Sequence, residues 1–187
     1  MKTLFIDTHS ETLRMAIVLD GNVVLEEKVS NRSHSEIAIP TLESVLNKAN
    51  IILEEIDEII VVNGPGSFTG VRIGVTIAKT IAYSLNKPIK TITSLEAYGV
   101  SDTNSFDIVT VKDSKGVYFA KKVGNEFVDF SYMKNGDFKA FIGRKHYSVC
   151  SNTKIDVLTV IDYLKGQKSI NPHSVNPVYI KEIDALK

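Results

Sequence analysis

The first 29 residues constrain the fold of this chain most, because they contain three successive strand-like segments. The segments are short, contain β-branched and other apolar residues, and cover residues 2–7, 13–20 and 23–29. Asp20-Gly21, between the second and third segments, suits a tight hairpin turn. The sequence therefore predicts that the chain opens with an antiparallel three-strand meander.

The hydrophobic period changes from that of a strand to that of a helix at Ser33. Ser33 and Glu36 have the spacing of a helix-capping box, and apolar residues then recur every three or four positions. Two helices are expected, each followed by a strand: helices at 33–50 and 69–86, strands at 58–63 and 90–93. A meander followed by two such units has the connectivity of a ribonuclease H-like lobe.

The second half of the chain shows the same order of elements with shorter helices. Strands are expected at 107–112, 116–123, 126–133 and 146–151, and helices around Phe138 and at 154–164. The expected fold class is α/β, with two ribonuclease H-like lobes of which the second is reduced. We expect domains at 1–97 and 98–187, with the boundary placed loosely at 94–104, where "SDTNS" marks a loop. The tail is expected to pack back on the first lobe and to end in a short strand or helix at 179–186.

Charge and composition argue against several classes of protein. Lys and Arg number 22, as do Asp and Glu, so no global basic field is available to hold a nucleic-acid backbone. The single Cys150 cannot form an internal disulfide, and the four histidines show no metal-ligand spacing with it. The apolar run in "MKTLFID" is too short for a signal peptide, and no segment reaches bilayer-spanning length. We expect a cytoplasmic globular protein without a metal site or a membrane contact.

The stretch "VVNGPGSFTGVRIG" places several glycines between an expected strand and an expected helix. A P-loop needs Gly-x-x-x-x-Gly-Lys-Ser/Thr, but Gly64 and Gly70 lie one residue too far apart and Val71 replaces the lysine. The dinucleotide fingerprint fails as well, because Thr69 stands where its third glycine belongs. Two interpretations stay open: a turn whose amides hold an anion, or a plain strand-to-helix turn with Ser67 or Thr69 as N-cap.

Two apolar stripes run along the expected helix at 69–86. One stripe is small and the other is large: Gly70, Gly74, Ala78 and Ala82 against Ile73, Ile77, Ile81 and Leu85. Glycine within a helix costs about 1 kcal/mol relative to alanine, so the small stripe indicates that another backbone approaches closely. We expect the isoleucine face to pack on the sheet and the small face to meet a second helix. That helix is either the one at 33–50 or part of another subunit, and the spacing leaves both open.

Acidic residues at strand ends are the candidates for metal chemistry. Asp7 and Thr8 end the first strand and Asp113 ends a later one, so the two acids could hold magnesium or could simply begin loops. His34 has Ala38 four residues on, so the helical His pair of metal sites is missing and His34 is expected at a surface or interface. No Ser-His-Asp set can be assembled from the sequence.

Longer blocks of the sequence resemble one protein family. The block "GPGSFTGVRIG" as a whole is similar to the signature of the TsaB or YeaZ family, accessory proteins of bacterial tRNA threonylcarbamoyladenosine biosynthesis. The resemblance extends to "FIDTHSE", "HSEIAIPTLESVL", "TSLEAYG", "VKDSKGVYFAKKV" and "NPVYIK". It is very close over residues 1–100 and looser beyond.

The resemblance implies a fold, a role and partners. The fold is that of the actin, sugar-kinase and heat-shock-chaperone superfamily. The role is that of a non-catalytic scaffold for TsaD, the paralogue that transfers threonylcarbamoyl to the adenosine beside the anticodon of tRNAs reading codons that begin with A. The ATPase TsaE completes the active complex, and tRNA is contacted only indirectly. No cofactor is implied for the protein alone, whereas ATP or ADP is implied at the interface of the complex.

In this family the two helices after the meander form a bundle with TsaD, or with a second copy of the same protein. The resemblance thus favours an intermolecular role for the small stripe. The interface residues that it implies are His34, Ile37, Thr41, Val45, Gly70, Arg72, Gly74, Ala78 and Ala82.

Two departures from the catalytic relatives imply a pseudo-enzyme. His34 lacks its partner, and Asp7 is followed by Thr8, His9, Ser10 and Glu11 instead of phosphate-binding glycines. A vestigial nucleotide or anion site is expected at Asp7, Thr8, Gly64, Gly66, Ser67 and Asp113. The alternative from another class is an enzyme, either an actin-like nucleotide hydrolase or a glycoprotease.

Overall fold

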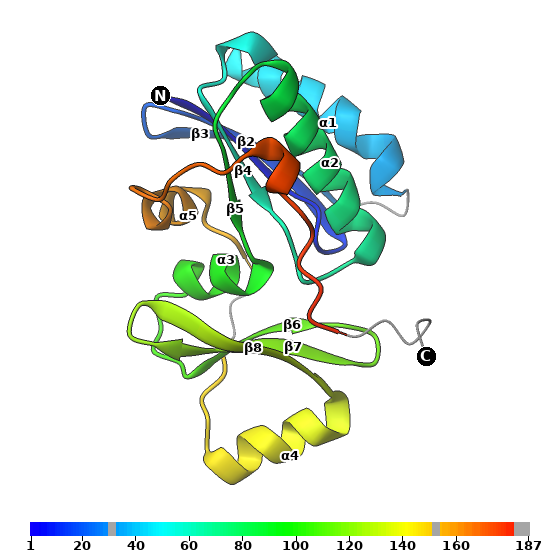
Figure 1. The fold of residues 1–187 in the computed structure, drawn as a ribbon, viewed down its shortest axis with the longest axis vertical. Coiled ribbons are helices and arrows are strands. Elements are labelled where there is room, and N and C mark those ends of the chain that lie inside the picture. The colour runs from blue at the N-terminus through cyan, green and yellow to red at the C-terminus, as the bar shows by residue number, and fades with distance from the viewer. Residues whose placement is uncertain (30–32, 151–153, 182–187) are drawn as a thin grey trace.

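The computed structural model describes residues 1–29, 33–150 and 154–181. Figure 1 shows two sheets, one above the other, with helices on their outer faces and between them. Within the described residues the upper sheet has five strands and the lower one has three. The α/β fold class predicted from the sequence is confirmed.

The first lobe is built on the five-stranded sheet. Its strands are β1 (Lys2–Asp7), β2 (Thr12–Leu19), β3 (Asn22–Val29), β4 (Glu58–Val62) and β5 (Ile89–Ile92). Their order is β3-β2-β1-β4-β5, with β1 antiparallel to β2 and parallel to β4. Asp20 and Gly21 both have positive φ, at 47° and 82°, as the predicted hairpin turn requires. This is the strand order of a ribonuclease H-like lobe.

Helices α1 (His34–Ala49) and α2 (Phe68–Ser84) cover one face of this sheet, and the short helix η1 (Leu53–Glu55) precedes β4. Their inward side chains close an apolar core with the strands, which includes Leu4, Ile6, Leu13, Ile59, Val61, Val71 and Val75. Each such side chain contributes about 1.5–3 kcal/mol through burial. This core fixes both helices against the sheet.

The small stripe of α2 meets a strand end rather than the second helix predicted from the sequence. A Cβ atom added at Gly70 would lie 2.2 Å from the Thr8 carbonyl oxygen, and one added at Gly74 would lie 2.3 Å from Thr8 Oγ1. Ala78 and Ala82, on the same stripe, are buried in the core. The close backbone is therefore the end of the chain's own first strand, because the small residues leave room for it. The predicted small-residue surface for a partner helix is wrong.

The second lobe is a reduced copy of the first. Strands β6 (Ile108–Lys112), β7 (Gly116–Val123) and β8 (Glu126–Lys134) form an antiparallel sheet, and α4 (Asn135–Lys145) packs on β7 and β8. Val149 makes a single parallel bridge to Ile108 in place of the strand expected at 146–151, and residue 151 lies outside the described residues. The order β8-β7-β6-Val149 repeats β3-β2-β1-β4.

Two further helices, α3 (Ser94–Ser101) and α5 (Val157–Tyr163), pack against each other and help join the lobes. They complete one core that the two sheets share, with Phe5, Ile60 and Ile92 from the first sheet, Val109 and Phe127 from the second, and Val160 from α5. The sequence prediction missed α3 and placed a loop at 94–104. Among the described helices, none is both long and apolar enough to span a bilayer.

The tail returns to the first lobe. Ile170 forms an antiparallel bridge with Ile89, the short helix η2 (Pro172–Ser174) packs on α2, and Val175 is buried in the core of the first lobe. Of the strand or helix expected at 179–186, residues 179–181 form neither, and residues 182–186 lie outside the described part of the chain.

Candidate functional site

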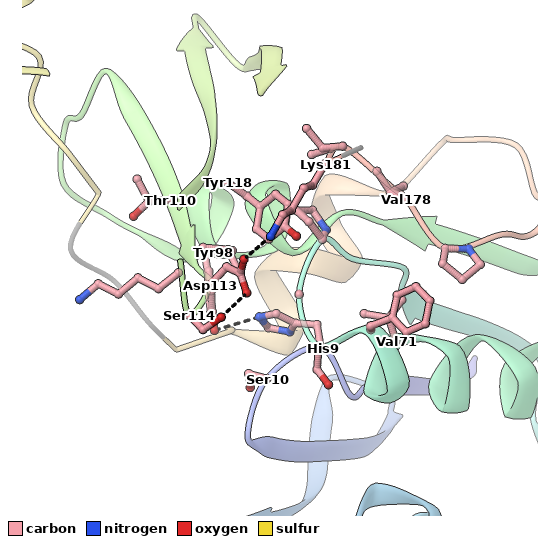
Figure 2. Close-up of a pocket in the computed structure, with 18 of the residues that line it drawn as sticks. His9, Ser10, Val71, Tyr98, Thr110, Asp113, Ser114, Tyr118, Val178 and Lys181 are labelled. Carbon is pink, nitrogen blue, oxygen red and sulfur yellow. Dashed lines mark hydrogen bonds and ion pairs between the residues drawn. The ribbon is translucent and has the colours of Figure 1, made fainter. Parts of the chain in front are cut away.

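A cleft of about 1210 Å³ lies between the two lobes (Figure 2). Its walls come from the β1–β2 turn, the glycine-rich turn before α2, α3, the β6–β7 region and the tail. Of the residues expected in a vestigial nucleotide site, Gly66, Ser67 and Asp113 line this cleft. Asp7, Thr8 and Gly64 are not among the described lining residues. The structure therefore brings together only part of the expected site.

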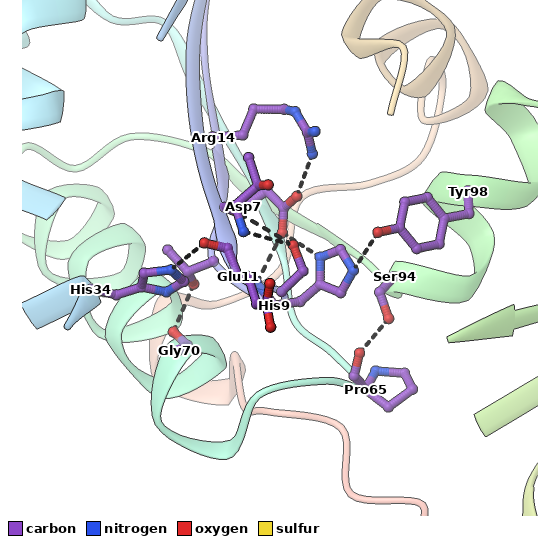
Figure 3. Close-up of polar contacts among 12 residues, drawn as sticks. Asp7, His9, Glu11, Arg14, His34, Pro65, Gly70, Ser94 and Tyr98 are labelled. Carbon is purple, nitrogen blue, oxygen red and sulfur yellow. Dashed lines mark hydrogen bonds and ion pairs between the residues drawn. The ribbon is translucent and has the colours of Figure 1, made fainter. Parts of the chain in front are cut away.

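Asp7 is a fully buried carboxylate whose charge is balanced within its own lobe (Figure 3). Arg14 Nη1 donates to Asp7 Oδ2 at 2.8 Å, and His9 Nδ1 lies 2.6 Å from Asp7 Oδ1. Burial raises the pKa of Asp7, but the charge and hydrogen bonds of His9 and the guanidinium of Arg14 outweigh it, so the pKa lies below its ordinary value. Both oxygens are thus occupied by the chain's own donors.

His9 connects Asp7 to helix α3. Its Nδ1 faces the Asp7 carboxylate, and its Nε2 lies 3.1 Å from the Tyr98 hydroxyl. Burial and the nearby Asp7 charge raise the pKa of Tyr98 to about 12, so it remains a donor. Sequence reasoning missed this network because it considered His9 only as a metal ligand. The signal was available in the Asp-x-His spacing at the end of a strand.

The glycine-rich turn is held by the chain's own hydrogen bonds. Ser67 Oγ accepts from the Gly70 amide at 3.2 Å, which makes Ser67 the N-cap of α2, one of the two residues proposed from the sequence. The Ser67 amide donates to the His9 carbonyl at 2.7 Å. A Cβ atom at Gly66 would lie 2.2 Å from the same carbonyl oxygen, so the turn presses directly on the β1–β2 turn. These two amides are therefore already used within the fold.

Asp113, on the opposite wall of the cleft, is also balanced by a cation of the same chain (Figure 2). Lys181 Nζ donates to Asp113 Oδ2 at 3.1 Å, and the Tyr132 hydroxyl donates to the same oxygen at 3.1 Å. Burial raises the pKa of Asp113, but the hydrogen bonds and the charge of Lys181 lower it by a larger amount. The pKa of Asp113 therefore lies below its ordinary value.

The two acids proposed for magnesium do not fit that role. Asp7 is enclosed by Arg14 and His9, and Asp113 is paired with Lys181, whereas magnesium prefers carboxylates free to take part in an octahedral oxygen shell. Among the described residues, no group of three or more His, Cys, Asp or Glu side chains could hold a metal ion. No reaction step through a metal-bound nucleotide follows from this arrangement.

A second hollow, the groove of about 440 Å³ between α1 and α2, lies on the outer face of the first lobe. It is lined by Ser35, Ala38, Ile39, Phe68, Thr69, Arg72, Ile73, Thr76 and Ile77. Ile39 is 49% exposed and Phe68 is 50% exposed, although both are large apolar side chains. Ile73 and Ile77, expected against the sheet, line this groove instead. Two members of the isoleucine stripe thus line the groove, whereas Ile81 of the same stripe is buried in the core.

The interface residues expected from the family resemblance divide into two groups in this structure. Arg72 is exposed, and His34 and Ile37 are half-buried at the surface of α1. The others are buried within the lobe: Thr41, Val45, Gly70, Gly74, Ala78 and Ala82. These six pack beneath the helices and leave no side-chain surface for another molecule. Ile39 and Phe68, which sequence reasoning did not select, are exposed in their place.

Comparison with known proteins matches mainly the first lobe. The family model "TsaD: tRNA N6-adenosine threonylcarbamoyltransferase" matches residues 21–109. The TsaB protein of Bacillus subtilis, named for tRNA threonylcarbamoyladenosine biosynthesis, is 43% identical over 97 residues, which are 51% of this chain and 42% of that protein. The TsaB protein of Haemophilus influenzae is 28% identical over 136 residues, 68% of this chain and 58% of that protein. The chain thus matches about half the length of these relatives.

Among solved structures, YeaZ from Pseudomonas aeruginosa matches nearly the whole chain. The TM-score is 0.74 with 19% sequence identity, and the match covers 95% of this chain and 99% of that one. At this identity the likeness concerns the fold, and it includes the reduced second lobe.

Proposed function

This chain belongs to the TsaB (YeaZ) family, and on that basis we propose that it is a non-catalytic scaffold in the biosynthesis of threonylcarbamoyladenosine in tRNA. It binds the catalytic paralogue TsaD through the α1–α2 groove, and TsaE joins this pair. Alone, it forms a homodimer through the same groove. It works in the cytoplasm and contacts tRNA only through its partners. It takes part in nucleotide binding only at its interface with TsaD.

One observation carries this proposal: the apolar lining of the α1–α2 groove is partly open to water. Ile39 and Phe68 are each about half exposed, and Ile73 and Ile77 lie beside them. Covering such side chains with a partner's apolar surface removes them from water, which is favourable by about 25 cal/mol per Å². Large apolar residues gathered in one groove are typical of a protein–protein interface.

The state of the acids supports a role without catalysis. Asp7, at the strand end where a catalytic carboxylate was considered, is buried and paired with Arg14 and His9. An acid that is already neutralised by two donors of its own chain has no free oxygen to orient a metal or a substrate. The chain's contribution is then to hold its partner in the competent conformation, which it can do by binding that conformation more tightly.

The groove is tested by Ile39→Lys, which places a charge where the partner's apolar surface would be buried. We expect binding to TsaD, measured by titration of the purified proteins, to weaken at least about tenfold, since about 1.4 kcal/mol corresponds to tenfold. Thermal unfolding of the variant should change little, because Ile39 is half exposed. Val123→Lys, 62% exposed in the second lobe, is the matched control. If Ile39→Lys binds TsaD with wild-type affinity, the groove is excluded as the TsaD-binding surface.

The cellular role is tested by depleting the protein and measuring threonylcarbamoyladenosine in bulk tRNA. We expect the modified nucleoside to fall, and to recover with wild-type protein but not with Ile39→Lys. An unchanged level of the nucleoside after depletion would contradict the proposed role.

The interlobe cleft favours a second candidate, an actin-like nucleotide hydrolase. It is large enough for a nucleotide, and Asp113 and Ser67 lie on opposite walls. Calorimetry of the isolated protein with Mg-ATP discriminates, because tight binding that Asp113→Ala removes would favour the hydrolase. A glycoprotease lacks comparable support, since both ring nitrogens of His9 contact Asp7 and Tyr98 rather than a nucleophilic Ser or Cys.

A further inference from the structure

The tail segment at residues 176–181, here called the strap, crosses from the first lobe to the second. At its start, the Val178 amide donates to the Asn63 carbonyl at 2.8 Å, and Asn63 Nδ2 donates to the Asn176 carbonyl at 3.2 Å. Asn63 directly follows β4, so this end is joined to the first sheet. At the far end, Lys181 forms its ion pair with Asp113 of the second lobe.

The middle of the strap contacts the groove helix. Arg72 Nε donates to the Tyr179 hydroxyl at 2.9 Å, and the ring centroids of Phe68 and Tyr179 are 5.9 Å apart. The Arg72 guanidinium also lies 3.7 Å above the Phe68 ring. Phe68 and Arg72 both line the groove, and Phe68 and Tyr179 both line the interlobe cleft. Tyr179 therefore lies between the two hollows and touches the residues that connect them.

The ion pair at the end of the strap is well supported on the second lobe. Asp113 also accepts from the Tyr132 hydroxyl, and Lys181 Nζ lies 4.7 Å from the centre of the Tyr132 ring. Lys181 is two residues from Tyr179, so the ion pair with the second lobe and the contacts with Arg72 and Phe68 lie on one short segment. A strap that only covered the core would need neither contact.

We propose that the strap couples the α1–α2 groove to the position of the second lobe, with Tyr179 and Lys181 as positioning residues for the partner-binding surface. This inference rests on the proposed function for the identity of the partner, TsaD. The strap holds Phe68 and Arg72 in place before binding, so that less conformational freedom is lost when a partner covers them. The reverse also holds: a partner that fixes Phe68 and Arg72 restricts the movement of the second lobe.

The free protein tests the coupling first, without any partner. Spin labels on Thr80→Cys in α2 and Lys139→Cys in α4, both exposed, report the distance between the lobes by pulsed electron paramagnetic resonance. We expect Lys181→Met and Tyr179→Ala each to broaden the distance distribution. The control is Lys121→Met, which removes the exposed ion pair with Asp129 within the second lobe. A distribution as narrow as that of the wild type in both strap variants overturns the proposal.

Titration with TsaD is the second measurement. We expect Lys181→Met and Tyr179→Ala to weaken binding about fivefold or more, the lower end of common coupling effects. Tyr179→Phe keeps the ring contact but loses the hydroxyl, so its affinity should be intermediate. Unchanged affinity in both strap variants overturns the coupling, even if their distance distributions broaden. Failure of the wild type to bind TsaD contradicts the proposed function. In that case the distance measurement alone tests whether the strap fixes the position of the second lobe.

Discussion

The Asp7 carboxylate has no exposed surface, and its charge is enclosed by neighbouring side chains of the same lobe. Its partner Arg14 is directly opposite on β2, where Asp7 and Arg14 are paired in the antiparallel register, and both side chains are buried. Removing one member of such a pair leaves the other charge without compensation in a medium of low polarity. The network therefore holds the β1–β2 hairpin and, through His9 and Tyr98, helix α3.

The lowered pKa of Asp7 predicts how the stability of the protein depends on pH. The pKa of Asp7 in the folded protein lies below the unfolded reference of 3.8. The ionised carboxylate therefore stabilises the fold at pH values above 3.8, and this stabilisation is lost as the pH falls through the folded pKa. In thermal unfolding, Asp7→Asn should be much less stable than the wild type at neutral pH, and this difference should shrink below about pH 4. Glu43→Gln, exposed on α1, is the control. A difference that is independent of pH would contradict the prediction.

Gly74 predicts a steric effect on the lone protein. A Cβ atom would lie 2.3 Å from Thr8 Oγ1, which donates to the Gly70 carbonyl at 2.7 Å and so cannot easily move. Gly74→Ala should therefore lower the free energy of unfolding by about 1–3 kcal/mol, despite the higher helix propensity of alanine. Gly143→Ala in α4, where nothing lies within 4 Å of the added atom, should instead be neutral or stabilising. Equal stability changes in the two variants, measured by denaturant unfolding, would refute the steric account.

At the scale of elements, two helices begin with similar sequences and different contacts. Before α3, Thr93 Oγ1 accepts from the Glu96 amide at 3.1 Å, and the Glu96 carboxylate accepts from the Thr93 amide at 2.8 Å. This is a complete capping box. Before α1, Ser33 has the same spacing to Glu36, but among the described contacts its hydroxyl makes no cap hydrogen bond and donates to the Glu36 carboxylate. The capping box predicted from the sequence at Ser33 is therefore wrong.

The contrast between the two helix starts can be measured. Thr93→Ala removes a cap bond and should cost about 1 kcal/mol of stability, which lowers Tm by about 2–4 °C in a chain of this size. Ser33→Ala removes no cap bond and should leave Tm nearly unchanged. A loss at Ser33 as large as that at Thr93 would show that the described cap geometry does not control stability.

Periodicity predicted the strands and helices of the first lobe but not which face of α2 is buried. It identifies residues that share a face, and α2 is apolar on two faces. The choice depends on what lies opposite, and Thr8 at the end of β1 fits only against glycine. Such a contact joins residues more than 60 positions apart, as in the hydrogen bond from Thr8 to Gly70. Local sequence patterns contain no information about it.

On the scale of the whole molecule, the sequence placed Gly66, Ser67 and Asp113 in one candidate site, and the structure brings these three to a common cleft. The cations that neutralise the acids were not anticipated. Arg14 could have been found from the register of the predicted hairpin, since it is the cross-strand partner of Asp7. Lys181 could not, because its approach to Asp113 depends on the path of a tail without regular structure.

The core that the two sheets share has a consequence for the part of the chain that is easiest to recognise. One face of the first sheet, which includes Phe5, Ile60 and Ile92, is covered by elements from later in the chain, among them Val160 and Leu164. A fragment that ended after β5 would leave this face open to water and prone to aggregation. The segment with the clearest family signature is thus not an autonomous folding unit: its solubility depends on residues that the family resemblance covers least.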